Sequence, residues 1–333
     1  MIENKDKYAY SSGRLACLWG NLLDESNTER MIDSKNADEA IKILNDLDFS
    51  DNLKELEDRK IEDFQYILDA ELLDVKKLFM AILPDYEDFS FLWYEYDFDN
   101  MRLCLKEKEG KIVSEKDYSP LGNYSIGEIK NFILLNKQEK IFEEEIINAI
   151  ITANESYKAQ KSDEAINIIL DKAYFELFKK TKKTKSEYIK KFILSRIDFY
   201  NIKNLLRIPR LKKELLTKSY LAVSGNIDIE ELNKVQTKDD LIKVIKNQDY
   251  GQAIEPGIVE FYRSGFFSLF EKNTGDWSSD YLKLAKHINY GPEAVVAYWY
   301  AKRNDIKNIR KILLDKIYGF DSNKTRKYLR KNF

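Results

Sequence analysis

One amphipathic phrase occurs four times along the chain and decides its fold. The copies read RLACLWGNLLD at 14–24, DFDNMRLCL at 97–105, DFYNIKNLL at 198–206 and DIKNIRKILL at 305–314. After each copy the sequence turns to the start of another helix at Ser or Asp: SNTE at 26–29, SIGE at 125–128, DIEE at 228–231 and DSNK at 321–324. The helix starts advance by roughly 100 residues each time, and a fixed period of this kind indicates a repeat architecture. Because the first and last copies lie near the two ends of the chain, the chain completes three periods.

Three periods predict three similar helical repeats, and we place them at residues 1–115, 116–217 and 218–333. We expect Asn100, Asn201 and Asp305 to lie at equivalent places in the three repeats. A superposition of the three repeats checks this prediction, which requires the three positions to overlay within one helical turn. Stretches rich in Gly, Ser or Pro are missing between the repeats, so we expect the repeats to pack on each other rather than move on flexible tethers.

Helical signals dominate the rest of the sequence. Asn36 is followed three residues later by Glu39, which is a capping-box pattern, and Thr237 is followed by Asp240 in the same layout. Apolar residues at three- and four-residue steps predict helices over 143–157 and 163–178. Alternating strands are absent, and the short candidate KIVS at 111–114 is assigned to a loop. The predicted fold class is therefore all-α.

Proline positions help to place the helix boundaries. We expect all five prolines between helices or near helix ends, where proline is tolerated: Pro84, Pro120, Pro209, Pro256 and Pro292. The stretch Gly291-Pro292-Glu293 is predicted to open the last long helix, with Glu293 near the positive end of the helix dipole. Trp299 and Ile309 should then lie on the buried stripe of this helix or of the next.

The composition is that of a charged protein with a large core. Of 333 residues, 55 are Lys or Arg and 57 are Asp or Glu, so the net charge of −2 does not point to a nucleic-acid partner. The charges are segregated: carboxylates gather in 24–74, and bases gather in 179–218 and 324–331. Such patches are either solvated helix faces or docking surfaces for partners of opposite charge.

Cysteine content and hydropathy bear on the compartment. Cys17 and Cys104 are the only cysteines, each inside an apolar helical stripe, which indicates a reducing cytoplasm rather than a disulfide framework. The polar start MIENKD does not resemble a signal peptide. The longest apolar stretch, at 294–301, is far too short to span a bilayer, so we expect no direct membrane insertion.

Catalytic chemistry is hard to find in this sequence. It contains no phosphate-binding loop and no Gly-x-Gly-x-x-Gly. His287 is the only histidine and cannot build a metal site or a triad alone, so we interpret it as structural. Neighbouring carboxylates such as Asp239 and Asp240 point in different directions on a helix and make poor acid/base pairs. We therefore predict no catalytic residue, no cofactor site and no metal site.

Two stretches are candidates for contact with other proteins. The aromatic run FSFLWYEY at 89–96 either packs in the core of the first repeat or forms an exposed patch for a partner. The basic run KKTKKTK at 179–185 contains two threonines, which lower helix propensity, so it is predicted as a loop or a frayed helix end. It either seats an acidic partner or only solubilises the surface. The candidate interface residues are Lys179, Lys180, Lys182, Lys183 and Lys185.

A resemblance to a known family rests on an ordered set of short motifs that covers essentially the whole chain. The motifs are Tyr8-Ala-Tyr, Gly13-Arg14, Leu22-Leu23, Asp97-Phe98 with Asn100, Asn201-Ile-Lys-Asn-Leu-Leu206, Gly291-Pro-Glu293, Ala297-Tyr298, Ala301-Lys302, Ile306-Lys-Asn-Ile309, Lys316 and Gly319. In this set the chain resembles the C subunit of the A-type, or bacterial V-type, rotary ATPase, which is related to the d subunit of the eukaryotic vacuolar ATPase. It departs from the family pattern at Ala294, where a second proline is common, and at Asp315, where glycine is common.

The resemblance implies a fold and a role. It implies a funnel of three helical domains about a pseudo-threefold axis, with the end of the central shaft, made of D- and F-type subunits, in its mouth. The base of the funnel would sit on the ring of proteolipid subunits at the cytoplasmic face of the membrane. Such a subunit transmits torque during ATP-driven ion transport or ATP synthesis and catalyses nothing itself.

Two other functions compete with this one. A helical-repeat scaffold that binds other proteins is the main alternative, although a solenoid of the TPR type would repeat about every 34 residues. An enzyme with an unrecognised helical active site is the second alternative, and the missing chemistry disfavours it.

Overall fold

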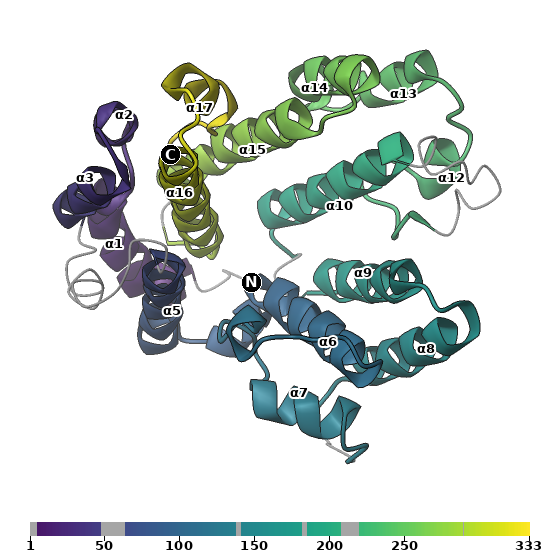
Figure 1. Cartoon of the computed structure of the whole chain (residues 1–333). Coiled ribbons are helices and arrows are strands. Elements are labelled where there is room, and N and C mark those ends of the chain that lie inside the picture. Colours follow the sequence, from purple (N-terminus) through teal and green to yellow (C-terminus); the bar gives the residue numbers. More distant parts are fainter. Residues whose placement is uncertain (1–4, 48–63, 138–140, 182–184, 208–219, 289) are drawn as a thin grey trace. The chain divides into compact units, whose positions relative to one another are not determined.

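The computed structural model describes residues 5–47, 64–137, 141–181, 185–207, 220–288 and 290–333. Every regular element in this part of the chain is an α-helix or a 3-10 helix, and no strand occurs in it, as the sequence predicts (Figure 1). The chain divides into two compact units. The first combines 1–84 with 245–333, and the second is the continuous stretch 85–244.

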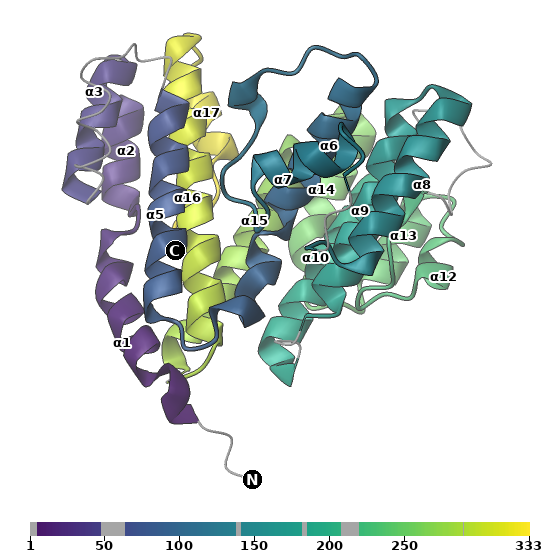
Figure 2. The same cartoon turned by 90° about the horizontal axis from the view of Figure 1, so that it is seen from below.

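The first unit is organised around α16 (Glu293–Ile317), its longest described helix. Helices α1 (Ala9–Leu18), α2 (Glu25–Asp33), α3 (Ala37–Lys42) and α5 (Phe64–Ile82) from the start of the chain pack on it. Helix α5 runs alongside α16 over much of its length (Figure 2). Helices α15 (Ser268–Lys283) and α17 (Ser322–Tyr328) also contact α16, and α14 (Gly251–Ser264) packs on α15.

Helix α16 is buried because neighbours surround it on nearly every side. Trp299 and Ile309 are both 0% exposed, as the sequence predicts. The helix opens at the expected residues, with Pro292 at the N-cap position and Glu293 in the first turn. A carboxylate at this end of the helix is stabilised by the helix dipole.

The second unit is built from helices that follow each other along the chain. After the 3-10 helix Tyr86–Leu92 come α6 (Tyr94–Lys108), α7 (Ile126–Ile133), α8 (Glu144–Gln160), α9 (Asp163–Lys179) and α10 (Glu187–Arg207). Helix α9 contacts α6, α8 and α10, and α6 also contacts α7. The short α12 (Ile229–Leu232) and α13 (Lys238–Ile245) end the unit.

The predicted helix starts are confirmed at most positions, because the expected side chains cap them. Asn36 Oδ1 accepts the Glu39 N–H at 2.9 Å, and Ser125 and Glu128 form a reciprocal capping box at α7. Asp228 and Asp321 cap α12 and α17. The residues KIVS at 111–114 form an irregular loop, also as predicted.

Three expectations about single residues are wrong. Helix α2 is capped by Asp24, which accepts the Asn27 N–H at 2.6 Å, so the helix begins before the expected Ser26. Pro256 lies inside α14, where its exposed position leaves the backbone carbonyl of Gln252 open to water. Cys17 is exposed rather than in an apolar stripe, because it lies two positions, about 200° around the helix, from the buried Leu15.

The aromatic run 89–96 belongs to the core of the second unit. Phe89 and Trp93 are 0% exposed and Phe91 is 2% exposed. Phe91 also packs on Phe178 of α9, with ring centroids 5.8 Å apart. The run therefore serves packing, and a partner patch at this place is excluded.

Candidate functional site

The described part of the basic run lies at the end of α9. Lys179 Nζ donates to the backbone carbonyl of Ser224 at 2.7 Å, and Lys180 Nζ pairs with Glu145 Oε1 at 3.0 Å. Both lysines lie at a helix C-terminus, where the dipole favours positive charge. The hydrogen bond to Glu145 raises the pKa of Lys180 above its ordinary value. These two lysines therefore already have partners within their own unit.

The rest of the run reaches the beginning of α10. Lys185 is exposed just before this helix. Lys182 and Lys183 lie outside the described residues. The structure thus places the ends of the run at the junction between α9 and α10.

A second set of polar residues, each 2% exposed or less, recurs on α6, α10 and α16. The repeated phrase in the sequence indicates these three helices but not the hydrogen bonds that these side chains make. Each of these helices carries an Asp followed three residues later by an Asn. The pairs are Asp97 with Asn100, Asp198 with Asn201 and Asp305 with Asn308. Such deeply buried polar groups persist in a core only where hydrogen bonds satisfy them.

Each aspartate holds the loop that precedes a helix start. Asp97 Oδ1 accepts the backbone N–H of Tyr124 at 3.0 Å, directly before the cap Ser125. Asp198 Oδ1 accepts the backbone N–H of Ile227 at 3.2 Å, directly before the cap Asp228. The same interaction therefore fixes two loops at the same position relative to the following helix.

The third aspartate repeats this contact across the whole length of the chain. Asp305 Oδ2 accepts the backbone N–H of Leu23 at 2.9 Å, directly before the cap Asp24 of α2. The loop for the last copy of the phrase is thus supplied by the N-terminal segment.

Each asparagine holds a stretch of backbone by both its amide atoms. Asn100 donates to the Ser119 carbonyl and accepts the Ser119 N–H, both at 2.8 Å. Asn201 donates to the Val223 carbonyl at 3.0 Å and accepts the Ala222 N–H at 2.8 Å. A side-chain amide that pairs in this way replaces the hydrogen bonds that an isolated extended segment lacks.

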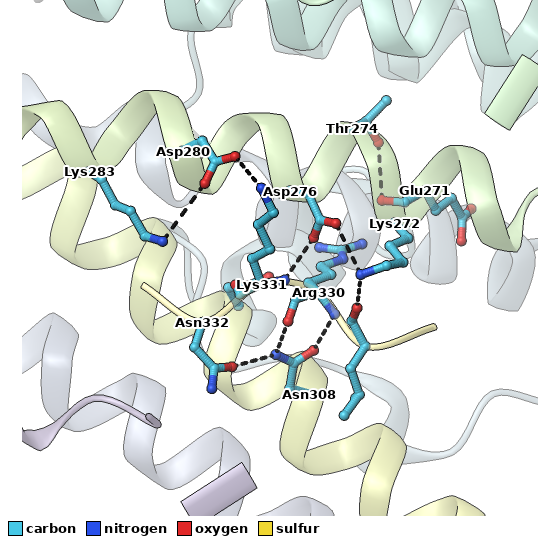
Figure 3. A network of polar contacts seen from close by, with 12 residues as sticks. Glu271, Lys272, Thr274, Asp276, Asp280, Lys283, Asn308, Arg330, Lys331 and Asn332 are labelled. Atoms are coloured by element: carbon cyan, nitrogen blue, oxygen red, sulfur yellow. Dashed lines mark hydrogen bonds and ion pairs between the residues drawn. The ribbon is translucent and has the colours of Figure 1, made fainter. Parts of the chain in front are cut away.

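The third asparagine is Asn308, and this corrects the expected equivalence of Asp305 with Asn100 and Asn201. Asn308 Nδ2 donates to the Arg330 carbonyl at 3.0 Å, and its Oδ1 accepts the Arg330 N–H at 3.1 Å (Figure 3). Asp305 makes the contact of Asp97 and Asp198 instead. Asp305 and Asn308 lie about one helical turn apart. The aspartate binds the loop before a helix start, whereas the asparagine binds an extended segment of backbone.

We call the three Asp/Asn pairs and the segments they hold the clamps. A glycine makes the first two clamps possible. A Cβ atom on Gly122 would lie 2.3 Å from Asp97 Oδ1, and a Cβ atom on Gly225 would lie 2.3 Å from Asp198 Oδ1. The loop backbone therefore has to come closer to the carboxylate than any other residue allows.

Residues 19–29 and 326–333 meet beside the third clamp. The ring of Phe333 stacks on Trp19, with centroids 5.2 Å apart. Asn332 Nδ2 donates to Thr28 Oγ1 at 2.9 Å, and Arg326 pairs with Glu29 of α2 at 2.8 Å. The first and last segments therefore form one continuous piece of the first unit.

The third clamp differs from the others in its charge. Lys302 Nζ lies 2.5 Å from Glu71 Oε1 of α5, and both side chains are almost fully buried. Asp305 interacts electrostatically with both Lys302 and Glu71. Its Oδ1 atom is buried without a hydrogen-bond partner. Burial raises the pKa of Asp305 from its ordinary 3.8 to about 7, although the Leu23 N–H and Lys302 oppose this. Lys302 thus pairs with Glu71, and the carboxyl group of Asp305 retains its proton more easily.

The raised pKa of Asp305 predicts a pH-dependent stability. Between its ordinary value of 3.8 and about 7 the folded chain binds a proton that the unfolded chain has lost, so stability falls as the pH rises through this range and levels off above it. Asp305→Asn keeps an oxygen that can accept from Leu23 and removes the titration. Between pH 5 and 8 the wild type should lose stability relative to Asp305→Asn by on the order of 3 kcal/mol, measured from urea midpoints. Parallel pH profiles of the two proteins would show that Asp305 is ionised throughout.

Chemistry other than these contacts is sparse. In the part of the chain that the structure describes, no three His, Cys, Asp or Glu side chains gather as a metal site requires. His287 is exposed at the end of the 3-10 helix Leu284–His287. Among the described helices, none combines the length and the hydropathy of a membrane-spanning segment.

Comparison with known proteins gives a consistent answer over the whole chain. The model of the ATP synthase (C/AC39) subunit family matches residues 12–328. The C subunit of the A-type ATP synthase of Methanocaldococcus jannaschii is 22% identical over 99% of this chain and 88% of its own length. The proteins of the same name from Pyrococcus abyssi and Pyrococcus furiosus are each 22% identical, over 92% and 94% of this chain and 85% and 87% of their own lengths.

Proposed function

The chain belongs to the ATP synthase (C/AC39) subunit family and is an accessory rather than a catalytic subunit, and from this premise we propose that it is a rotor subunit. In this role it connects the central shaft of the rotary ATPase to the ring of membrane subunits. It carries torque between ATP hydrolysis or synthesis and ion movement. The observation that carries the proposal is the family match, which extends over 12–328.

The clamps support a torque-bearing role because they fix loops that would otherwise bend. A loop between two helices is usually the most mobile part of a helical protein. Here each of three loops is bound to a long helix through a buried carboxylate. Close packing and buried hydrogen bonds make an element stiff, and stiffness is what transmission of torque needs.

The clamps also support the proposal of three repeats at 1–115, 116–217 and 218–333. The same Asp-x-x-Asn pair, loop and helix cap recur three times, and the third set is completed by residues from the beginning of the chain. A chain that closes on its own repeat in this way fits an arrangement about a pseudo-threefold axis. The funnel shape belongs to this proposal as well.

The proposed partners are the D- and F-type shaft subunits and the proteolipid ring, at the cytoplasmic face of the membrane. The test is a pull-down with the tagged chain from native membranes solubilised in mild detergent. We expect shaft and ring subunits to co-purify in fixed proportion. Recovery of unrelated soluble proteins without either component would favour the scaffold alternative.

The basic run offers a specific docking prediction. Lys179 and Lys180 have partners within their own unit, so the reversal is made at the other three positions, Lys182, Lys183 and Lys185, each changed to Glu. If the run seats an acidic partner, this variant should slow assembly with the shaft or the ring by about tenfold at low salt, and the difference should shrink as salt rises. Association rates measured by surface plasmon resonance check this.

The matched control carries the same change of charge elsewhere in the sequence. Lys234, Lys243 and Lys246 are exposed on and around α13, and their reversal to Glu should leave the association rate unchanged. If both triple variants slow assembly equally, only net charge matters. If neither does, the run is a solvated loop.

A further inference from the structure

A cavity of about 270 Å³ lies between α15, α16 and the C-terminal segment of the first unit. Asn308 of the third clamp forms part of its wall. The lining residues come from all three elements: Ser268, Glu271, Lys272, Lys307, Asn308, Lys311, Tyr328 and Arg330. We call this space the basic cavity.

The basic cavity has more positive than negative charge. Four of its lining side chains are cations and only Glu271 is a carboxylate. Asp276 pairs with Lys272 at 3.0 Å, and Asp315 pairs with Lys311 at 2.8 Å. The cations therefore still outnumber the carboxylates when these neighbours are included.

The cations are held by the surrounding structure rather than spread over an open surface. The side-chain amide of Asn308 binds both the N–H and the carbonyl of Arg330, as Figure 3 shows. Lys272 Nζ donates to the carbonyl of Leu329. The side chain of Arg330 lies directly on the bare backbone of Gly275, where an added Cβ would come within 2.7 Å of its Cδ. A guanidinium group in a fixed place loses less entropy when it binds an anion.

We propose that the basic cavity binds a free phosphate-type anion of the size of pyrophosphate. Arginine and lysine together bind phosphate oxygens through short, charge-assisted hydrogen bonds. Ser268 and Tyr328, whose side chains carry neutral hydroxyl donors, also line this space. Its volume of about 270 Å³ lies below the roughly 300–1,000 Å³ of sites that enclose drug-sized ligands, which suits a small anion.

Calorimetry with sodium pyrophosphate, and separately with inorganic phosphate, tests the proposal on the full-length chain. We expect one saturable site for pyrophosphate. Lys307→Gln and Arg330→Gln each remove one charged donor from the cavity. Each variant should therefore weaken the binding of pyrophosphate by about tenfold or more. Circular dichroism shows whether each variant is folded. If Arg330→Gln is unfolded, the binding result for Lys307→Gln alone decides the test.

The control is Lys283→Gln, which removes the same charge from α15 outside the cavity and should bind pyrophosphate like the wild type. Equal weakening in Lys283→Gln and Lys307→Gln would reduce the effect to net charge and overturn the proposal. Absence of saturable binding at millimolar pyrophosphate would overturn it as well. Phosphatidylcholine vesicles containing phosphatidic acid form a second arm: binding to vesicles without binding of free pyrophosphate would assign the cavity to a lipid headgroup instead.

Discussion

Asp198→Ala is expected to lower the free energy of unfolding by roughly 3–5 kcal/mol. The Asp198 side chain is 0% exposed and accepts hydrogen bonds from the backbone N–H groups of Asn226 and Ile227, at 2.9 and 3.2 Å. It also accepts from the side chain of Asn226 at 3.0 Å. Alanine would leave the N–H of the buried Ile227 without its acceptor and would remove the charged acceptor of both Asn226 donors, although the Asn226 side chain keeps Ser195 Oγ at 3.1 Å. A hydrogen bond to a charged group is worth about 1.5–3 kcal/mol.

Urea denaturation followed by circular dichroism measures this effect. Asp239→Ala is the control, because Asp239 has an exposed side chain on α13, and its replacement should change stability by less than about 0.5 kcal/mol. Asp198→Asn should fall between the two, since one oxygen remains to accept. A midpoint of Asp198→Ala equal to that of the control would show that the clamp on this loop adds nothing to stability.

Ile309→Ala is expected to cost about 2–5 kcal/mol through the cavity that it leaves in the core of the first unit. Ile309 is 0% exposed on α16, which neighbours surround on nearly every side. Little can collapse into the space, because the facing helices are themselves fixed by other contacts. The cost should therefore lie in the upper half of the range.

The comparison for Ile309→Ala is Leu314→Ala, five residues along the same helix. Leu314 is 36% exposed, so its truncation removes fewer contacts and should cost less than half as much. Differential scanning calorimetry of both variants and the wild type gives the order. An unchanged melting temperature for Ile309→Ala would mean that the helix does not lie in the core as described.

Local signals in the sequence were enough to predict the fold class and most helix starts. Asn36, Ser125 and Asp228 cap helices as their neighbours indicate, because a cap depends on residues only two or three positions away. The aromatic run 89–96 is buried, which agrees with its density of large apolar side chains. The prediction that Pro256 lies near a helix end is wrong, because water can hydrate the carbonyl of Gln252 that proline leaves without its helical hydrogen bond.

The clamps could not be predicted in the same way, because their partners lie far along the chain. Asp305 and Leu23 are separated by 282 residues, so no local pattern around either residue shows that they meet. One signal was present: Asp and Asn are spaced by three residues on three helices, and a Gly-Asn dipeptide precedes three of the helix starts, at 20–21, 122–123 and 225–226. The docking role of the basic run stays a prediction, since Lys182 and Lys183 lie outside the described residues.

The most direct test of the rotor proposal is ATP-driven ion transport by the complex with and without this chain. Membrane vesicles that carry the ATPase are depleted of this protein, and ATP hydrolysis and ion uptake are then measured on the same preparation. The account predicts that hydrolysis persists on the catalytic part while ion uptake is lost, and that the purified chain restores uptake. Undiminished ion uptake per ATP in vesicles that lack the chain would contradict it.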